Sequence, residues 1–259
     1  GLADRLAERL SAAGGTPVLL RAGAAAGAVD PADRAALAVA LDRTVPDAGL
    51  RGIVHLWSLD ARPDAADPLR WAAHDAVLSV VHLAAELEQR GLAAPTFLVT
   101  DGAQAVADVS ETGLLQSSLL GVGRVLHHEL SGLRTRLVDL DPRDRTGSAA
   151  RLFDELTITD TDEDQVAFRD GERLVARLHP SARSGGRIPA RMRPDGAYLV
   201  TGGLGALGRL VLVALAERGA GHLVVTSRSG LPPRDEWDGL TDPAQRDAVT
   251  AVRAAEAAG

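Results

Sequence analysis

The chain of 259 residues contains no cysteine and no lysine, and it has a single tyrosine, Tyr198. Without cysteine it can form no disulfide bond and no thiolate metal site, and it has no thiol nucleophile. All 28 basic residues are therefore arginines, so chemistry that needs a lysine amine is excluded from these residues. The lack of cysteine fits a reducing compartment, and we expect a cytoplasmic protein.

The sequence also lacks any apolar run approaching the roughly 18–20 residues that a membrane-spanning helix needs. Its formal net charge of −7 argues against a general nucleic-acid-binding surface. We therefore expect neither a membrane nor a nucleic acid among its partners. Apolar residues make up 46% of the chain, enough for a globular core, and the length allows one large or two ordinary domains.

Strand-like and helix-like stretches alternate along the first two thirds of the chain, which is typical of βαβ units around a mostly parallel sheet. Asp170 and Gly171 then stand between two alternating runs, a pattern that predicts a β-hairpin over residues 165–178. The fold class is therefore α/β. We expect strands at residues 16–20, 52–60, 95–101 and 134–140, and helices at residues 2–10, 31–41, 72–89, 114–130 and 149–156.

The periodic patterns stop near residue 180, and the stretch that follows is rich in arginine, serine, glycine and proline. We predict a first unit over residues 1–180, a linker over 181–195 and a second unit over 196–259. The second unit offers only two strands, too few for a stable doubly wound sheet, and the first opens on a helix. We therefore expect both α/β units to be incomplete.

The most informative stretch is the start of the second unit, where Gly203, Gly205 and Gly208 fit the pattern G-x-G-x-x-G. The motif follows an apolar strand and opens an amphipathic helix, which is the context that a dinucleotide-binding turn requires. Such a turn brings backbone N–H groups and the helix N-terminus against a pyrophosphate, so side chains are excluded at the points of closest approach.

The second strand of this unit is expected at residues 222–230, and it places Thr226, Ser227 and Arg228 about 20 positions beyond the glycines. A site for NAD places an acidic residue near this position, on the ribose hydroxyls. A hydroxyl and a guanidinium suit a 2′-phosphate instead, so we predict NADPH as the cofactor. The expected cofactor-binding residues are Thr201, Gly203, Leu204, Gly205, Ala206, Leu207, Gly208, Ser227 and Arg228; a plain structural turn is the alternative for the glycines, and a solvated side chain for Arg228.

Two other patterns could be mistaken for sites. His127 and His128 are adjacent and lack the i, i+4 spacing of a zinc helix, and the acidic residues at 160–164 lack the glycine and terminal glutamate of a calcium loop. We predict no metal site. Gly121 and Gly123 lack the third glycine of a nucleotide motif, so we expect a packing role for them.

The residues that carry chemistry now show a family resemblance. Residues 201–208 (TGGLGALG) followed by 226–229 (TSRS) closely resemble the cofactor-binding start of ketoreductase domains in modular polyketide synthases, members of the short-chain dehydrogenase/reductase superfamily. Residues 121–130 (GVGRVLHHEL), 137–142 (LVDLDP) and 174–178 (LVARL) resemble the structural subdomain that precedes the catalytic one. The resemblance covers essentially the whole chain.

The resemblance implies two Rossmann-like units, in which a non-catalytic structural subdomain braces the NADPH-binding catalytic subdomain. It also implies a reaction, the reduction of a β-ketoacyl group on an acyl carrier protein to a β-hydroxyacyl group. The acyl carrier protein and the neighbouring domains of the synthase are the implied partners.

The chain departs from the family pattern in its catalytic residues. Family members use a tyrosine with a nearby lysine, which lowers the tyrosine pKa and holds the ribose. Here lysine is absent, and Tyr198 lies before the glycine turn, where we expect it to pack. We predict no catalytic residue within this chain, which is then a fragment of an active ketoreductase. The alternative is a structural or pseudo-ketoreductase unit that scaffolds a synthase module without reducing anything.

Overall fold

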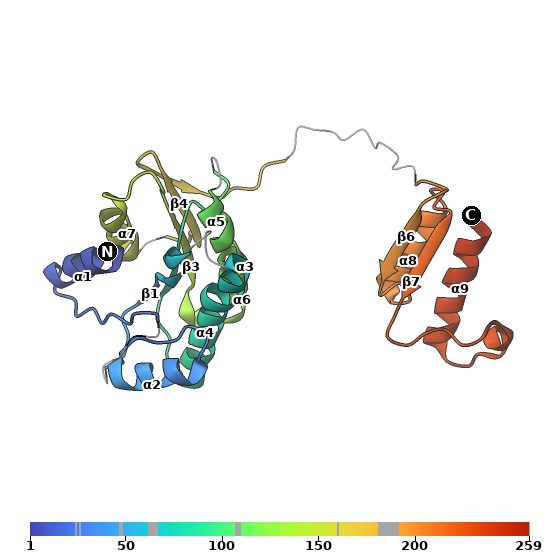
Figure 1. Cartoon of the computed structure of the whole chain (residues 1–259), viewed down its shortest axis with the longest axis horizontal. Coiled ribbons are helices and arrows are strands. Elements are labelled where there is room, and N and C mark those ends of the chain that lie inside the picture. The colour runs from blue at the N-terminus through green and yellow to red at the C-terminus, as the bar shows by residue number, and fades with distance from the viewer. Residues whose placement is uncertain are drawn as a thin grey trace. The chain divides into compact units, whose positions relative to one another are not determined.

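The computed structural model describes residues 1–23, 25, 27–46, 49–61, 67–106, 110–159, 161–180 and 192–258. It divides into two compact units, Gly1–Leu178 and His179–Gly259, which are shown in Figure 1. Each unit is an α/β structure of its own. No helix among the described residues combines the length and apolar character needed to cross a membrane.

The first unit is built on a five-stranded sheet in the order β1-β2-β3-β4-β5. The first four strands run parallel, and β5 closes an antiparallel hairpin with β4. Asp170 and Gly171 form its turn with φ of 49° and 86°, which confirms the hairpin predicted there. The strands are β1 (Ile53–His55), β2 (Thr96–Asp101), β3 (Arg136–Leu140), β4 (Gln165–Arg169) and β5 (Glu172–Val175).

Helices cover both faces of this sheet, and the central strands are buried on both sides. Leu98 on β2 belongs to a core cluster with α2, α4 and α6, whereas its neighbour Val99 belongs to a cluster with α1 and α7. Successive strand residues point to opposite faces, so a strand buried on both faces needs a continuous apolar run. The helices are α1 (Leu2–Ala12), α2 (Arg34–Thr44), α3 (Pro68–Trp71), α4 (Ser79–Gln89), α5 (Glu111–Gln116), α6 (Ser118–Glu129) and α7 (Ser148–Thr157), with the 3₁₀ turns η1 (Trp57–Asp60) and η3 (Ser131–Leu133) and the π-helical stretch η2 (Ala72–Leu78).

Gly123 lies on α6 where that helix meets the sheet. A Cβ atom at this position would come 2.5 Å from Leu137 Cδ2 on β3, so a larger residue would push helix and strand apart. The packing role predicted for Gly123 is confirmed. Gly121 has open space around its Cα and shows no such contact.

Several predicted elements were wrong in kind or extent. The strand predicted at residues 16–20 is irregular, because none of the strands that the structure describes pairs with it. The strand predicted at 52–60 ends at His55, and the chain turns into η1, where the Ser58 hydroxyl donates a hydrogen bond to the Val99 carbonyl. The helix predicted at 114–130 is divided at Ser117 into α5 and α6, and the one predicted at 72–89 contains the π-helical turn η2.

The second unit contains two parallel strands, β6 (Ala197–Thr201) and β7 (His222–Thr226), joined by α8 (Ala206–Ala216). The turn η4 (Arg234–Gly239) and the helix α9 (Pro243–Ala258) follow. Trp237 is buried under the guanidinium groups of Arg234 and Arg253, 4.8 Å and 5.6 Å from its ring centre. Most of the predicted linker, residues 181–191, lies outside the described residues.

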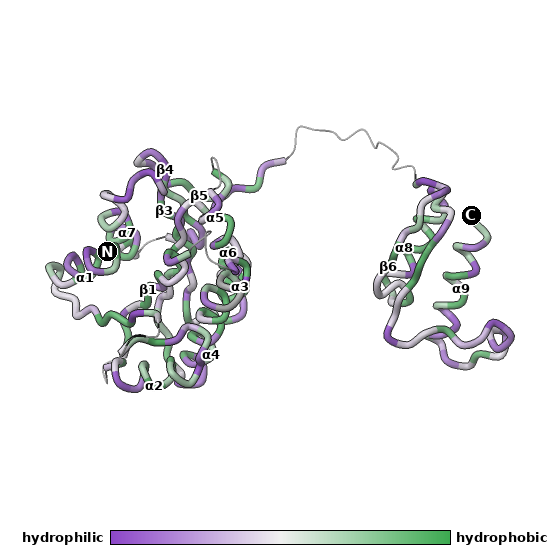
Figure 2. Tube along the Cα trace, viewed as in Figure 1, coloured by the Kyte–Doolittle hydropathy of each residue, from purple (hydrophilic) through white to green (hydrophobic). Residues whose placement is uncertain are grey.

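Leu199 and Val224 are 64% and 50% exposed on the two strands, while the residues on either side of each one in its strand are partly buried. Leu207 and Leu210 on α8 are 79% and 69% exposed. Figure 2 shows the corresponding hydrophobic stretches of this unit in green. Apolar surface is therefore left uncovered on the second unit, in contrast to the covered central strands of the first.

Candidate functional site

The loop between β6 and α8 is short and anchored by its own backbone. Gly202 has a φ of +66°, a conformation that favours glycine, and it turns the chain away from β6. The Gly203 N–H donates to the Thr226 carbonyl at 3.1 Å, and the Gly205 N–H donates to the Gly202 carbonyl at 3.0 Å. The glycine loop is thus tied to the end of β7 before the helix begins.

Two of the predicted glycines stand where a side chain has no room. A Cβ atom on Gly203 would come 2.6 Å from Val225 Cγ1, and one on Gly208 would come 2.4 Å from the Gly202 carbonyl oxygen. A Cβ atom on Gly205 would come 3.2 Å from the same oxygen, a milder contact. Gly203 and Gly208 therefore allow the loop, the strand and the first turn of α8 to approach closely, as a dinucleotide-binding turn requires.

The N-terminus of α8 has no side-chain cap. Gly205 stands at the N-cap and offers no acceptor, whereas Asp33 at the N-cap of α2 accepts hydrogen bonds from the Ala35 and Ala36 N–H groups. The first N–H groups of a helix lack intrahelical acceptors, and they carry the positive end of the helix dipole. The start of α8 is consequently available to an anion.

The second loop of the site follows β7. The register pairs Thr201 with Thr226, so both loops leave the sheet at its carboxyl edge. The Ser227 hydroxyl donates to the Ser229 carbonyl at 3.0 Å, which holds the loop in a tight turn. The Arg228 side chain is exposed, and within the described part of the chain it forms no ion pair.

A pocket of about 490 Å³ lies between these two loops. Four residues predicted to bind the cofactor line it together: Leu204, Gly205, Ser227 and Arg228. Thr201, Gly203, Ala206, Leu207 and Gly208 do not line it; the glycines among them shape the turn from behind.

Gly202, Thr226 and Ser229 also line the pocket and were absent from the predicted set. Gly202 could have been found from the sequence, because the turn needs one residue with positive φ before the motif glycines. Thr226 and Ser229 flank the predicted Ser227 and Arg228, so the whole loop should have been assigned to the site.

Tyr198, the single tyrosine, lies on β6. Its hydroxyl oxygen accepts a hydrogen bond from the Arg193 N–H at 2.6 Å, and the residue is half-buried. The side chain thus secures the segment that enters β6, which agrees with the structural role predicted for it.

The carboxyl end of the first sheet is closed by the protein itself. The buried Asp139 carboxylate on β3 accepts hydrogen bonds from the Ala103 N–H at 2.8 Å, the Gln104 N–H at 3.0 Å and the Thr100 hydroxyl at 2.6 Å. It also pairs with Arg169 Nη2 at 2.6 Å. The backbone donors after β2 are therefore taken by a side chain, and that end of the sheet offers them to no ligand.

Comparison with known families divides the chain in the same way. Residues 6–178 match the family described as "Polyketide synthase extender module SpnB, Rossmann fold domain". Residues 196–258 match the family described as "KR domain".

Curated relatives of known identity are large synthases. The chain is 39% identical over 153 residues to 5-methyl-1-naphthoate synthase of Streptomyces sahachiroi, a match over 59% of this chain and 8% of that protein. It is 40% identical over 152 residues to a phenolphthiocerol/phthiocerol polyketide synthase of Mycobacterium tuberculosis, a match over 58% of this chain and 8% of that protein. The matched region is thus a small part of each relative.

Solved structures with a similar fold include the first ketoreductase of the tylosin synthase, with a TM-score of 0.68 and 28% identity. That match covers 100% of this chain and 50% of the other. A structure of A-type ketoreductases from a modular polyketide synthase matches with a TM-score of 0.59 and 29% identity, over 87% of this chain and 45% of the other. The chain spans about half the length of these structures.

Proposed function

The chain belongs to the ketoreductase domains of polyketide synthases, which have the short-chain dehydrogenase/reductase fold, and we propose that its second unit binds NADPH for the reduction of a β-ketoacyl group. The observation that carries this proposal is the pocket between the glycine loop and the loop of Arg228, beside the uncapped start of α8. Bound there, NADPH would supply the hydride for the reduction.

The residues of the pocket fit a dinucleotide with a 2′-phosphate. The N–H groups at the start of α8, which no side chain caps, would hold the pyrophosphate. Arg228 would hold the 2′-phosphate, because a guanidinium binds phosphate through two parallel hydrogen bonds. The Ser227 hydroxyl would donate to the same phosphate in place of the Ser229 carbonyl. Thr226 and Ser229 complete the same wall.

The family supports a proposal for the substrate and the partners. We infer that the complete domain accepts a β-ketoacyl chain on an acyl carrier protein and returns the β-hydroxyacyl product. The neighbouring domains of the synthase would deliver and remove that carrier. The matched relatives named as polyketide synthases support this setting.

The residues of this chain would serve binding rather than proton transfer. Lysine is absent and the tyrosine hydroxyl is held by the Arg193 N–H, so no tyrosine–lysine pair is present to protonate a developing alkoxide. We propose that this polypeptide binds the cofactor without completing the reaction. Oxidation of NADPH by the purified chain with a β-ketoacyl thioester would contradict this.

Cofactor titration of a charge-reversed variant tests the phosphate assignment. We expect Arg228→Glu to weaken NADPH binding by about tenfold or more, since hydrogen bonds to charged groups contribute about 1.5–3 kcal/mol. NADH, which has no 2′-phosphate, should bind the variant nearly as it binds the parent chain. Fluorescence titration of both cofactors gives the two dissociation constants.

Arg246→Glu is the matched control, because it makes the same charge change at an exposed position on α9 that does not line the pocket. Its NADPH affinity should stay close to that of the parent chain. Equal weakening by both variants would reduce the effect to net charge and contradict a contact through Arg228. If the parent chain binds neither cofactor, the scaffold function is favoured instead.

A further inference from the structure

The loop that carries Arg228 is held at its two ends. Residues 227–230 are all exposed, so the rest of the second unit covers them only in part. At one end the loop continues from β7, which pairs with β6. At the other end the chain becomes half-buried again at Leu231 and Pro232. The contacts that fix Pro232 therefore decide where the far end of this loop lies.

Pro232 is fixed by the buried side chain of Trp237 in η4. The indole N–H of Trp237 donates to the Pro232 carbonyl at 2.9 Å, and the residue is 8% exposed. The guanidinium carbons of Arg234 and Arg253 lie 4.8 Å and 5.6 Å from the centre of its ring. A guanidinium over an indole face is attracted by the electrons of the ring. We call the group of Trp237, Arg234 and Arg253 the tryptophan clamp.

The tryptophan clamp is attached to α9 by two ion pairs. Arg253 on α9 pairs with Asp238, beside Trp237 in η4, at 2.6 Å. Arg234 in η4 pairs with Glu256 on α9. Exposed ion pairs are individually weak. These two join the same pair of elements in opposite directions, however, so together they orient η4 on α9 around the buried ring.

α9 in turn packs along α8, the helix whose start borders the cofactor pocket (Figure 1). Leu212 on α8 and Val249 on α9 are both buried. Arg209 Nη2 on α8 lies 3.5 Å from the Asp247 carboxylate on α9. The two walls of the pocket are therefore joined through α8, α9 and the tryptophan clamp, as well as through the strands.

The chain between the tryptophan clamp and Arg228 is short, and part of it is stiff. Three residues separate Arg228 from Pro232. Pro232 and Pro233 have a fixed φ, and each restricts the residue before it. Pro233 has φ of −51° and ψ of 148°, an extended conformation. Since both ends of this stretch are fixed, Arg228 has little room to leave the pocket, whereas release of Pro232 would let the loop turn at Gly230.

We propose that Trp237 is a positioning residue for the cofactor: its bond to the Pro232 carbonyl keeps the loop of Arg228 at the pocket, with the guanidinium in place for a 2′-phosphate. The proposal deepens the proposed function and rests on it, because the group that is positioned is Arg228. A loop that is already in place has less freedom to lose when the phosphate binds. NADH has no 2′-phosphate, so Trp237 acts on the selectivity between the two cofactors rather than on binding in general.

Trp237→Phe tests the proposal, because the phenyl ring still lies beside both guanidinium groups of the clamp while the bond to Pro232 is lost. NMR relaxation of the cofactor-free 259-residue chain measures the first effect. We expect the backbone order parameters of residues 228–230 to fall, while those of residues 203–208 in the glycine loop stay unchanged. Unchanged order parameters at residues 228–230 overturn the proposal, whether or not a cofactor binds.

Cofactor affinity measures the second effect. We expect Trp237→Phe to raise the dissociation constant for NADPH about threefold or more and to leave that for NADH unchanged. In a chain that carries Arg228→Gln, the same replacement should have no further effect, because the guanidinium that it positions is absent. Equal weakening of NADPH and NADH, or further weakening in the Arg228→Gln chain, would overturn the proposal, since Trp237 would then only stabilise the unit.

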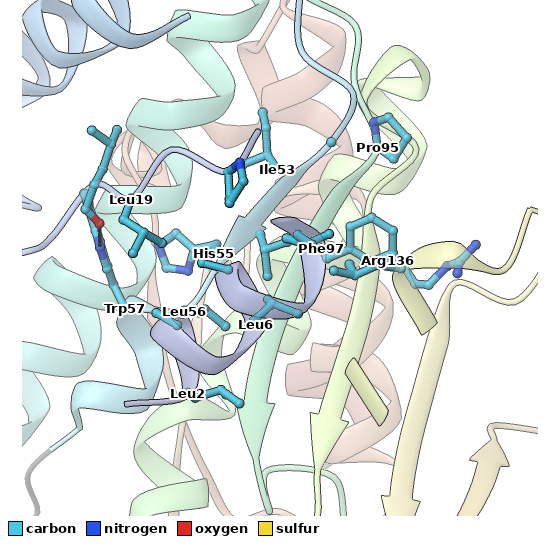
Figure 3. A pocket seen from close by; sticks show the side chains of 18 of the residues that line it. Leu2, Leu6, Leu19, Ile53, His55, Leu56, Trp57, Pro95, Phe97 and Arg136 are labelled. Carbon is cyan, nitrogen blue, oxygen red and sulfur yellow. Dashed lines mark hydrogen bonds between the residues drawn. The ribbon is translucent and has the colours of Figure 1, made fainter. Parts of the chain in front are cut away.

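The matched control is Trp57→Phe in the first unit. Trp57 lines the open cavity beside β1, which Figure 3 shows, and its indole N–H likewise donates to a backbone carbonyl, that of Leu20, at 3.2 Å. This variant should leave the order parameters of residues 228–230 and both dissociation constants as they are in the parent chain, and changes as large as those of Trp237→Phe overturn the proposal. Failure of the parent chain to bind NADPH contradicts the proposed function and, with it, the effect of Trp237 on selectivity; the order parameters then decide whether Trp237 holds the loop.

Discussion

The two units end their parallel strands in opposite ways. At the carboxyl edge of the first sheet, the Asp139 carboxylate takes the N–H groups of Ala103 and Gln104 and pairs with Arg169. At the carboxyl edge of the second sheet, the start of α8 has no side-chain cap and lies beside the pocket of Arg228. The same α/β plan therefore gives one closed edge and one open edge.

This difference separates the two roles inferred for the units. A protein carboxylate in the first unit occupies the position where an anion would meet backbone N–H groups, and it thereby contributes to a rigid core. In the second unit, glycines stand where side chains would fill the same space. This edge of the first unit is closed by a side chain, and the corresponding edge of the second unit is suited to binding an anion.

The largest effect is expected from opening the closed edge. Asp139→Ala would leave the Arg169 charge buried with no carboxylate partner and two N–H groups unpaired, so we expect a loss of about 3–5 kcal/mol in the free energy of unfolding of the first unit. Urea denaturation, followed by the fluorescence of the first unit's tryptophans, measures it.

The control for this prediction is Glu163→Ala, which removes an exposed ion pair with Arg177. Exposed ion pairs contribute little to the free energy of unfolding, so the urea midpoint of this variant should stay close to that of the parent chain. Equal destabilisation by the two variants would show that the closed edge has no special part in holding the first unit together.

The second effect depends on pH and concerns His55. Burial lowers the pKa of its imidazole from 6.5 to about 4, so the unfolded chain binds this proton more readily than the folded one. The contribution of neutral His55 to the free energy of unfolding is fully present above pH 6.5. It declines as the pH falls toward 4, by about 3 kcal/mol in all.

Replacement by leucine should remove this part of the pH dependence. The difference in unfolding free energy between the parent chain and His55→Leu is expected to change between pH 7 and pH 4, whereas His128→Gln, at an exposed site on α6, should track the parent chain. Denaturant titrations at both pH values measure these differences. Parallel pH profiles for the parent chain and His55→Leu would mean that the pKa of His55 is the same in the folded and unfolded states.

The smallest of these effects is expected in the second unit, where the glycine loop has no room for an added side chain at Gly208. Gly208→Ala places a Cβ atom 2.4 Å from the Gly202 carbonyl oxygen, and such overpacking costs about 1–3 kcal/mol. We expect lower thermal stability of this unit and weaker NADPH binding. Gly230→Ala, at a position with open space around it, should leave both unchanged.

Much of the fold could be predicted because its signals are local. The hairpin turn at Asp170 and Gly171, the apolar strands β2 and β3, and the glycine turn before α8 all follow from residue types at short spacing. The strand expected at residues 16–20 was wrong because strand formation depends on a partner, and its residues line the open cavity beside β1 instead.

The candidate site was partly predictable for the same reason. Gly203 and Gly208 indicate that the loop, the strand and the helix approach one another closely. Arg228 follows the second strand at the expected distance from the glycines. Nothing in the sequence showed that Asp139 accepts the N–H groups of Ala103 and Gln104, because that contact joins residues 35 and 36 positions apart. Which edge is open and which is closed became visible only in three dimensions.

The most direct test of this account is an NMR titration of the labelled 259-residue chain with NADPH. We predict that the amide signals of residues 202–208 and 227–229 shift with the added cofactor, while those of Ala103 and Gln104 keep their positions. Absence of any shift in the second unit, or shifts at Ala103 and Gln104, would contradict the assignment of the open edge as the cofactor site.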